Sequence, residues 1–344
     1  MITVTVSIPT YNRCGYLKEA IDSVLAQTYS DFKLLITDNG SQDGTRELVE
    51  GYIARDSRII YHRFSSNQGP ALNWKYALTN PTTDLVAFLP DDDLWLPKHL
   101  EYAVTSMREI PDASLYGCAC EAFGDFPVQI QAFKMMFPLW LADSRERVVY
   151  DARENFVPLL MGTPLAASSI VLRRRLLDGL RFYEDDNFAP GDYFLWAQLA
   201  LRGVLVYEPI VNALYRWHPG NDSIRYRSKF DSAATFYFAL RQLSIMAMRE
   251  KALTPQMLVD EAVNWPIARL STLVIALATL DAPPSLRRAA LQLFRKRRED
   301  GDDPQARRHF RIAGKIGEWY LSVADIMERT RGWWWKPKGA TIIN

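Results

Sequence analysis

Three consecutive aspartates, Asp91 to Asp93, stand in the segment LPDDDLWLP directly after an apolar run. Three ionised carboxylates side by side repel one another, unless one of them is protonated or a cation lies among them. Carboxylate oxygens suit Mg²⁺ or Mn²⁺, and Mg²⁺ is usually held by one or two carboxylates together with substrate phosphates. The alternative interpretation is a solvated turn in which Asp93 caps a helix that begins near Pro97.

Turn-forming and polar residues also follow the three other strands predicted in the first hundred residues. The segments that carry them are VSIPTYNR (6–13), ITDNGSQDGT (36–45) and NQG (67–69). Each of them could be only a strand-end turn, since Gly40 and Gly44 supply the permissive backbone of an Asx-type turn. The carboxyl ends of parallel strands gather the ligand-binding loops at one edge of a sheet. We therefore expect all four segments to meet at that edge.

Alternating strands and helices must position these segments. Short apolar runs rich in β-branched residues predict strands, and apolar residues at helical spacing predict helices between them. The predicted strands are 2–8, 32–36, 58–64 and 85–89, and the predicted helices are 17–25, 45–54 and 70–78. This βαβαβαβ order is typical of an α/β fold with a parallel sheet.

The pattern changes near Tyr226. Before that point we expect the sheet to be completed by strands 114–122, 168–173 and 204–207 and a helix over 192–201. After it the pattern is helical, over 230–249, 255–280, 285–298 and 305–329. We therefore predict two parts, 1–225 with the sheet and 226–344 as a helical C-terminal region.

Composition limits the classes of function. Of 344 residues, 48% are hydrophobic, which is ordinary for a globular protein with a full core. Lys plus Arg number 41 and Asp plus Glu number 40, so the net charge gives no reason to expect nucleic acid as a partner. Three cysteines without zinc-ligand spacing are interpreted as reduced side chains. The N-terminus does not have the pattern of a secretory signal, and we expect a cytoplasmic protein.

The four segments occur in the same order as in the inverting family 2 glycosyltransferases of the GT-A fold, which the chain resembles over roughly Met1 to Ser223. One such motif is weak evidence, whereas four in order at successive strand ends are strong evidence. The resemblance implies a Rossmann-like, mainly parallel central sheet flanked by helices, with a C-terminal helical region. It also implies transfer of a sugar from a nucleotide-diphosphate sugar, UDP-linked, to a saccharide or glycoconjugate acceptor, as in bacterial surface polysaccharide synthesis.

Under this resemblance the loops after the first three strands hold the nucleoside. Pro9, Thr10 and Tyr11 would form the floor of the pocket, with Tyr11 stacking on the base. Asp38 would accept a hydrogen bond from the imide N–H of uracil or thymine. Many relatives carry an arginine in the following helix, and here Lys75 would supply that charge unless it is an exposed lysine on a solvated face. The donor-binding residues implied are Pro9, Thr10, Tyr11, Asn12, Asp38, Asn67, Gly69, Lys75, Asp91 and Asp92.

The aspartate triplet would bind the diphosphate end of the donor. The family pattern is acidic, any residue, acidic, so Asp91 would contact the ribose and Asp93 would hold Mn²⁺ or Mg²⁺. Many relatives have a further acidic residue where this chain has Pro90, which shifts the assignment by one position and makes Asp92 the alternative in either role. His218, in a segment that resembles the family's R-x-H-x-x-x-x-S element, would be a metal ligand or diphosphate contact, unless it is a simple loop residue. The implied metal ligands are Asp91, Asp93 and His218, and Arg216, Ser223 and Arg225 are further candidates for the diphosphate.

Asp192 would be the catalytic base. The segment GDYFLW (191–196) resembles the family's ED-x-x-L-W element, with Gly191 in place of the glutamate. Inverting transfer needs a group that takes a proton from the acceptor hydroxyl while that oxygen attacks the anomeric carbon. A carboxylate at a helix N-terminus can stay ionised for this role. The alternative is that Asp192 only caps its helix.

The acceptor and the partners of the helical region are left open. Trp140, Trp196 and Trp217 could offer flat faces to a sugar ring, although such tryptophans more often lie in a core. The basic helical region ends GWWWKPKG, which could bind the inner face of an anionic membrane and a lipid-linked acceptor, contact a second subunit or stay in solvent. Two other function classes are a sugar nucleotidylyltransferase, which should carry a glycine-rich basic loop after the first strand, and a non-catalytic nucleotide-sugar-binding module.

Overall fold

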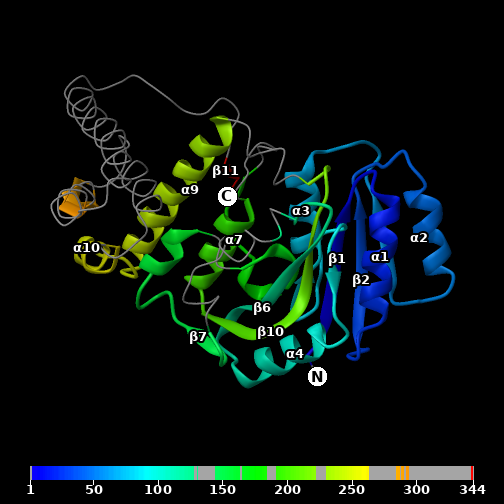
Figure 1. Cartoon of the computed structure of the whole chain (residues 1–344), viewed down its shortest axis with the longest axis horizontal. Helices are drawn as coiled ribbons and strands as arrows, with labels where there is room; N and C mark the ends of the chain where they lie inside the picture. The colour runs from blue at the N-terminus through cyan, green and yellow to red at the C-terminus, as the bar shows by residue number, and fades with distance from the viewer. Residues whose placement is uncertain are drawn as a thin grey trace.

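A nine-stranded sheet forms the centre of the computed structural model (Figure 1). The structure describes residues 2–127, 130, 144–162, 165–183, 191–221, 230–262, 284–286, 288–289, 292–293 and 342–343. The strands of the sheet are β1 (Val4–Thr10), β2 (Phe32–Asp38), β3 (Ile59–Arg63), β4 (Leu85–Phe88), β5 (Leu94–Trp95), β6 (Ala113–Gly124), β7 (Val148–Tyr150), β8 (Val171–Arg173) and β10 (Val204–Trp217). Their order is β3-β2-β1-β4-β8-β6-β10-β5, and β7 pairs with β10. The pairs that join β1, β2, β3 and β4 are parallel, and so is β6 with β10. The predicted, mainly parallel sheet is confirmed.

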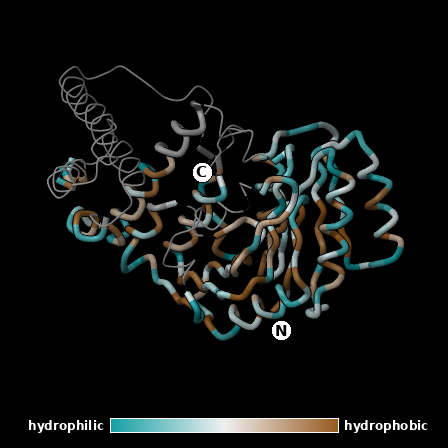
Figure 2. The backbone as a smooth tube through the Cα atoms, viewed as in Figure 1, coloured by the Kyte–Doolittle hydropathy of each residue, from teal (hydrophilic) through white to brown (hydrophobic). Residues whose placement is uncertain are grey.

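Helices cover both faces of this sheet. They are α1 (Cys14–Leu25), α2 (Thr45–Ile53), α3 (Pro70–Thr79), α4 (His99–Glu109), α7 (Gly191–Ala200), α9 (Phe230–Arg249) and α10 (Pro255–Ala262). One core cluster joins α1 and α4 to the sheet, and another joins α3 and α7 to it. Figure 2 shows hydrophobic residues concentrated along the strands, with hydrophilic residues on the outer turns. The amphipathic pattern of α1, α2 and α4 matches their buried faces, whereas residues 193–200 of α7 are all buried.

Two strands differ from their predicted bounds. The predicted strand 168–173 begins instead as a short 3-10 helix, η3 (Ala167–Ser169), because the N–H and hydroxyl of Ser169 both bond to the carbonyl of Ala166. Only residues 171–173 remain extended, as β8. The strand predicted over 204–207 continues to Trp217, since a register shift between Glu208 and Val211 carries the chain past a proline that cannot donate to the ladder.

The C-terminal helices share a core with α7. Ala239, Leu240 and Leu243 of α9 are buried in one cluster with Tyr193 and Phe194 of α7. Figure 1 shows α9 and α10 at the end of the molecule away from α1 and α2. The predicted division between 1–225 and 226–344 falls within 222–229, outside the described residues, and stays a prediction. The predicted helix over 305–329 and the segment GWWWKPKG also lie outside the described residues. Among the helices that are described, none is long and apolar enough to cross a membrane.

Candidate active site

The turn after β1 is held by the loop after β2. Asn12 adopts φ 53°, a conformation that few non-glycine residues take. Its N–H donates to Ser41 Oγ at 2.9 Å and its Oδ1 accepts from the N–H of Gln42 at 2.7 Å. These bonds stabilise a turn that leaves Tyr11 39% exposed at the carboxyl edge of the sheet. Asn12 thus lies at the predicted edge, where it links the loop after β1 to the loop after β2.

Pro9 and Thr10 end β1 as buried strand residues. They pair in register with Thr37 and Asp38 of the neighbouring strand β2. Asn73 of α3, which has no role in the predicted site, lies beneath them, and its Nδ2 donates to the carbonyls of Thr10 at 3.4 Å and Thr37 at 3.1 Å. A buried asparagine that bonds to both strand ends holds them at a fixed separation.

Asn39 and Asn67 join the loops after β2 and β3. Asn39 Nδ2 donates to Asn67 Oδ1 at 2.9 Å, and Asn39 Oδ1 accepts from the N–H of Gln68 at 2.8 Å. The N–H of Gly69 donates to the same Asn67 oxygen at 2.8 Å, and its φ of 86° favours glycine. The structure therefore brings the predicted residues Asn67 and Gly69 to the carboxyl edge, where they shape the loops.

Asp38 lies beneath the surface at the end of β2, with no exposed area. Its Oδ1 accepts from the N–H of Ser41 at 2.8 Å, and its Oδ2 accepts from the hydroxyl of Tyr61 at 2.6 Å. Arg63 Nε lies 3.3 Å from Oδ2. Since these partners all come from the protein, a contact between Asp38 and a base would require Tyr61 or Arg63 to move.

The three aspartates after β4 differ in their partners, although Asp91 and Asp92 share Arg13 Nη1. Asp93 is 1% exposed, and its Oδ1 accepts from the N–H of Arg216 at 2.8 Å. Burial, with the charge of Asp92 added, raises the pKa of Asp93 well above its usual value. Burial also raises the pKa of Asp91 to about 6, with Arg13 opposing the shift and Asp92 adding to it. Asp93 is thus directed into the fold, where it holds the end of β10.

Asp92 places one carboxylate oxygen between an arginine and a histidine. Its Oδ2 lies 2.8 Å from Arg13 Nη1 and 3.0 Å from His218 Nε2. Arg13 Nη1 also lies 3.1 Å from Asp91 Oδ1, and its Nη2 donates to the carbonyl of Gly220 at 2.7 Å. His218 Nδ1 accepts from the N–H of Gly220 at 3.2 Å, which assigns the ring proton to Nε2. Side chains from three separate loops therefore meet at one oxygen.

A divalent cation fits the pair Asp92 and His218. The 3.0 Å between Oδ2 and Nε2 is about the spacing of adjacent ligands in an octahedral site with metal–ligand distances of ~2.1 Å. Carboxylate and imidazole together suit Mn²⁺. Binding at Nε2 requires its proton to leave, and a proton that moves to Nδ1 ends the bond from the N–H of Gly220. Since Asp92 Oδ2 contacts His218, whereas Asp93 Oδ1 accepts from the N–H of Arg216, the geometry favours Asp92, the alternative assignment, over Asp93. Within the described residues no three His, Cys, Asp or Glu side chains form a complete metal site, and donor phosphates would supply the remaining ligands.

Asp192 stands in the first turn of α7. Its Oδ1 accepts from the N–H of Tyr193 at 2.7 Å, and burial raises the pKa of Asp192 to about 6. Trp196, one helical turn further on, contacts Phe88 at the end of β4 with ring centroids 6.5 Å apart. This contact places α7 beside the strand that leads to the aspartate triplet.

The remaining predicted residues have other surroundings. Lys75 Nζ lies 5.8 Å from the ring centre of Phe182, in β9 (Phe182–Tyr183), which pairs with β11 (Ile342–Ile343). Trp196 and Trp217 are 0% exposed, so the interpretation of these two as sugar platforms is wrong: they fill the core. Trp140, Ser223 and Arg225 lie outside the described residues.

Two arginines near the triplet have local roles that the sequence motifs did not indicate. Arg216 Nε donates to the carbonyl of Asp92 at 2.8 Å, and its Nη2 pairs with Glu19 at 2.8 Å. Nε and Nη2 thus have partners within the protein, and a contact of Arg216 with a diphosphate stays a prediction. Arg13 stands inside the segment VSIPTYNR. The signal that could have found it is electrostatic, because three adjacent carboxylates need a cation and Arg13 leaves the neighbouring parallel strand at the same edge.

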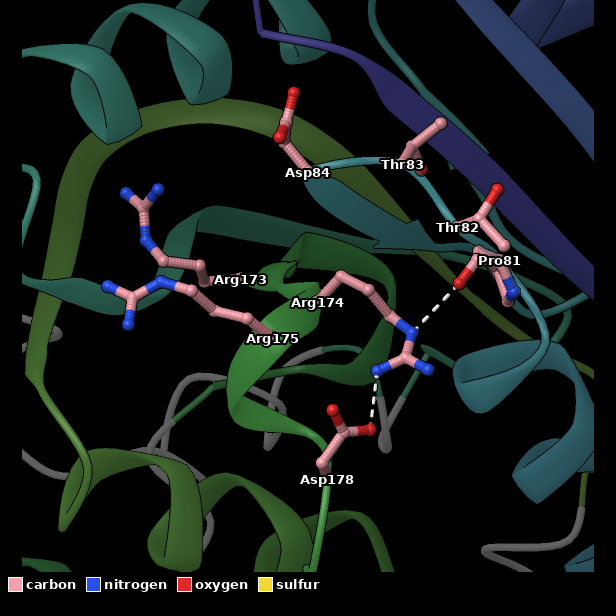
Figure 3. Close-up of a pocket in the computed structure, with 8 residues that line it drawn as sticks. All are labelled: Pro81, Thr82, Thr83, Asp84, Arg173, Arg174, Arg175 and Asp178. Atoms are coloured by element: carbon pink, nitrogen blue, oxygen red, sulfur yellow. Dashed lines mark hydrogen bonds and ion pairs between the residues drawn. The ribbon is translucent and has the colours of Figure 1, made fainter.

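A cavity of about 400 Å³ lies at the opposite, amino edge of the sheet (Figure 3). Asp84, which precedes β4, and Arg173 and Arg174, at the end of β8, line it. Arg174 donates to the carbonyls of Pro81 at 2.8 Å and Thr79 at 2.9 Å, as Figure 3 shows for Pro81. Arg173 donates to the carbonyls of Ala113 at 2.7 Å and Met107 at 2.9 Å. Its arginines brace the backbone, and none of the predicted site residues lines it.

Comparisons with known proteins agree with this geometry. A model of glycosyl transferase family 2 matches residues 5–178. The putative glycosyltransferase EpsE of Bacillus subtilis is 27% identical over 249 residues, which cover 70% of this chain and 83% of EpsE. Other bacterial glycosyltransferases match over as little as 17% of their own length.

Solved structures show the same fold. TarS 1–349 of S. aureus, in complex with UDP-GlcNAc, has a TM-score of 0.61 at 15% identity over 96% of this chain and 92% of that one. The mannosyltransferase PcManGT of Pyrobaculum calidifontis, in complex with GDP-Man and Mn²⁺, has a TM-score of 0.52 at 17% identity over 94% and 86%. The nucleotidylyltransferase and non-catalytic interpretations are set aside by the family match. This chain belongs to glycosyl transferase family 2 and is a glycosyltransferase of the GT-A fold.

Proposed function

We propose that this glycosyltransferase transfers a sugar, with inversion, from a UDP-linked sugar to a saccharide or glycoconjugate acceptor, with Mn²⁺ or Mg²⁺ at the aspartate triplet. The observation that carries the proposal is the 3.0 Å approach of Asp92 Oδ2 to His218 Nε2, from segments 126 residues apart. A carboxylate and an imidazole that meet at the carboxyl edge of an α/β sheet suit a metal-bound diphosphate. The complexes of TarS with UDP-GlcNAc and of PcManGT with GDP-Man and Mn²⁺ support the donor class and the metal.

The nucleoside is assigned to the loops after β1 and β2. Tyr11 is 39% exposed there and offers a face on which a base can stack. Asp38 contacts the imide of the base if Tyr61 or Arg63 gives way, and otherwise orders the wall of the pocket through those two side chains. The N3–H of uracil can donate to a carboxylate and the unprotonated N3 of cytosine cannot, so Asp38 selects UDP over CDP, and the TarS complex with UDP-GlcNAc supports UDP over GDP.

The residues around the diphosphate divide into ligands and supports. Asp92 and His218 would hold the metal, which when bound stabilises the negative charge of the departing diphosphate. Asp91, which is 4% exposed, is assigned to the ribose. Asp93 bonds to the N–H of Arg216, two residues before His218, and so fixes the position of that histidine.

Asp192 is assigned as the base for the acceptor. The acceptor hydroxyl oxygen forms a bond to the anomeric carbon, its proton passes to Asp192, and the bond to the nucleoside diphosphate breaks with its electron pair on the leaving oxygen. A pKa of about 6 leaves the carboxylate mostly ionised at neutral pH yet basic enough to take a proton in the transition state. The helix that carries Asp192 is supported from behind by α9.

We propose that residues 226–344 carry the contacts to the acceptor, to a second subunit or to the inner face of the membrane. The shared core of α7 and α9 supports the acceptor role, because it couples this region to the helix of the proposed base. The putative teichuronic acid biosynthesis glycosyltransferase TuaG of Bacillus subtilis, 35% identical over 106 residues, supports an acceptor of the surface polysaccharide class.

A panel of nucleotide sugars tests the donor. Melting temperature and slow donor hydrolysis would be measured with UDP-, dTDP- and GDP-linked sugars, each with Mn²⁺ and with EDTA. We expect a UDP-sugar to raise the melting temperature most, and only with the metal. A stabilising effect that is equal with EDTA would contradict the metal, and a preference for a GDP-sugar would contradict the assignment of the base.

A further inference from the structure

Arg13 occupies the place of a cation beside Asp92. Its Nη1 lies 2.8 Å from the same Oδ2 that approaches His218 Nε2, and 3.1 Å from Asp91 Oδ1. Asp91 and Asp92 are almost fully buried, whereas the Arg13 side chain is 24% exposed. The guanidinium therefore neutralises the triplet from its solvent side.

The backbone on both sides of Arg13 is fixed. The preceding Asn12 is bonded to Ser41 and Gln42, and the N–H of the following Cys14 donates to Asp43 Oδ2 at 3.0 Å. The side chain, in contrast, has several rotatable bonds and is 24% exposed. A change of partner at Arg13 can therefore occur by side-chain rotation, without movement of the loop.

A metal on Asp92 and the guanidinium on Asp92 compete for one oxygen. Both are positively charged, so the approach of a divalent ion to Oδ2 is opposed by Arg13 at 2.8 Å. A nucleoside diphosphate changes this balance, because it brings negative charge for the metal and an acceptor for the guanidinium. The affinity for the metal is therefore expected to be low in the absence of the diphosphate and higher in its presence.

We propose that Arg13 is an internal counter-cation that the metal displaces from Asp92, and that this exchange couples the binding of metal and nucleoside diphosphate. The inference rests on the metal assignment of the proposed function. When Arg13 leaves Asp92 it also leaves the carbonyl of Gly220, to which its Nη2 donates at 2.7 Å. Binding of the donor therefore removes a hydrogen bond from the loop that carries His218. Arg13 acts here as a positioning residue that sets metal affinity.

Titration of the full chain with Mn²⁺ alone, by calorimetry, tests the exchange. Arg13→Gln removes the charge and should bind Mn²⁺ at least ~10-fold more tightly than the unmodified protein, since the metal no longer opposes a guanidinium. Arg13→Lys keeps the charge and should stay close to the unmodified protein. Arg55→Gln, at an exposed position after α2, is the matched control for loss of one arginine. Equal or weaker Mn²⁺ binding by Arg13→Gln would overturn the inference.

The coupling is also measurable without any variant. In the unmodified protein, a saturating concentration of UDP should raise the Mn²⁺ affinity at least ~10-fold, and Mn²⁺ should raise the UDP affinity by the same factor. A factor near one would overturn the inference even if Arg13→Gln failed to fold. Asp92→Asn separates the two hypotheses: if it abolishes Mn²⁺ binding while Arg13→Gln changes nothing, only the exchange is wrong. If no form binds millimolar Mn²⁺ even with UDP, the metal assignment fails and the exchange fails with it.

Discussion

Arginines at the two edges of the sheet have different kinds of partner. At the amino edge, Arg173 and Arg174 donate mainly to main-chain carbonyls, which cannot change charge and cannot leave without opening the fold. Arg174 Nη1 also pairs with the exposed carboxylate of Asp178 at 2.8 Å. At the carboxyl edge, Arg13 donates to the carboxylates of Asp91 and Asp92, which could bind a metal instead. A carboxylate that can exchange an arginine for a metal ion can take part in ligand binding, whereas a main-chain carbonyl bonded to an arginine contributes to stability. Ligand binding is therefore expected at the carboxyl edge of the sheet, and a contribution to stability at the amino edge.

The largest expected effect at the carboxyl edge concerns Asp192. Asp192→Asn keeps the shape of the side chain and removes its basicity, so transfer should fall by the ~10²–10⁴ typical of a lost general base. The affinity for the donor should barely change, because Asp192 is assigned to the acceptor. Single-turnover transfer beside a donor titration measures both. Normal transfer by this variant would mean that another group is the base.

The second effect separates Asp92 from Asp93. Asp92→Asn should weaken Mn²⁺ binding in the presence of UDP roughly 100-fold, as expected when one partner of a buried charged contact is removed. Asp93→Asn is the matched control, since its amide oxygen can still accept from the N–H of Arg216. Calorimetric titration of both variants checks the order. Stronger loss in Asp93→Asn would return the metal to the assignment first expected from the motif.

The amino edge should respond in stability and not in transfer. Arg174→Met removes the hydrogen bonds to Pro81 and Thr79 and the exposed ion pair with Asp178, while keeping an apolar stem, and should lower the free energy of unfolding by about 2 kcal/mol. Transfer per folded molecule should be unchanged. Denaturant unfolding and an assay at low temperature measure the two quantities. Arg175→Met, at an exposed neighbouring position, is the control. A fall in transfer without a fall in stability would contradict the division between the edges.

The smallest effect is a pH dependence. Because burial raises the pKa of Asp192 to about 6, transfer should increase as pH rises through 6 and be about tenfold lower at pH 5 than its plateau. Stability has the opposite sign: a carboxyl whose pKa is above its usual 3.8 favours the folded state at low pH and loses that contribution as pH rises to about 6. Transfer rates and melting temperatures from pH 5 to 8 would therefore distinguish titration of the base from unfolding. A rate that is flat across pH 6 would contradict the assignment.

The order of strands and helices could be predicted because its signals are local. The apolar spacing of α1 and the turn glycines after β2 and β3 act within a few residues, and they place the four segments at one edge. The bounds of a predicted strand were wrong where a side chain bonds to the backbone, as the hydroxyl of Ser169 does at the start of the predicted strand 168–173. The family motifs identified the candidate residues in the same way, segment by segment.

The partners of those residues could not be predicted in this way. Which aspartate faces His218 depends on how the chain turns after β4, and a shift by one residue exchanges a side chain that contacts His218 for one that bonds to the N–H of Arg216. Arg13 and Gly220 are 207 residues apart in sequence, so no local pattern reports their contact. The burial of Trp196 and Trp217 likewise depends on packing between distant elements.

The shared core of α7 and α9 has a consequence for how relatives of this protein exchange parts. Tyr193 and Phe194 are buried against Ala239, Leu240 and Leu243, so the helix with the proposed base is complementary in shape to the region after it. A chimera joined between the two helices would pair surfaces that had not been selected together, and would leave cavities or clashes behind the base. A chimera joined before Gly191 would inherit both helices from one parent. A chimera that replaces the proposed acceptor region is therefore expected to keep its stability only when the whole unit from α7 onward comes from one parent.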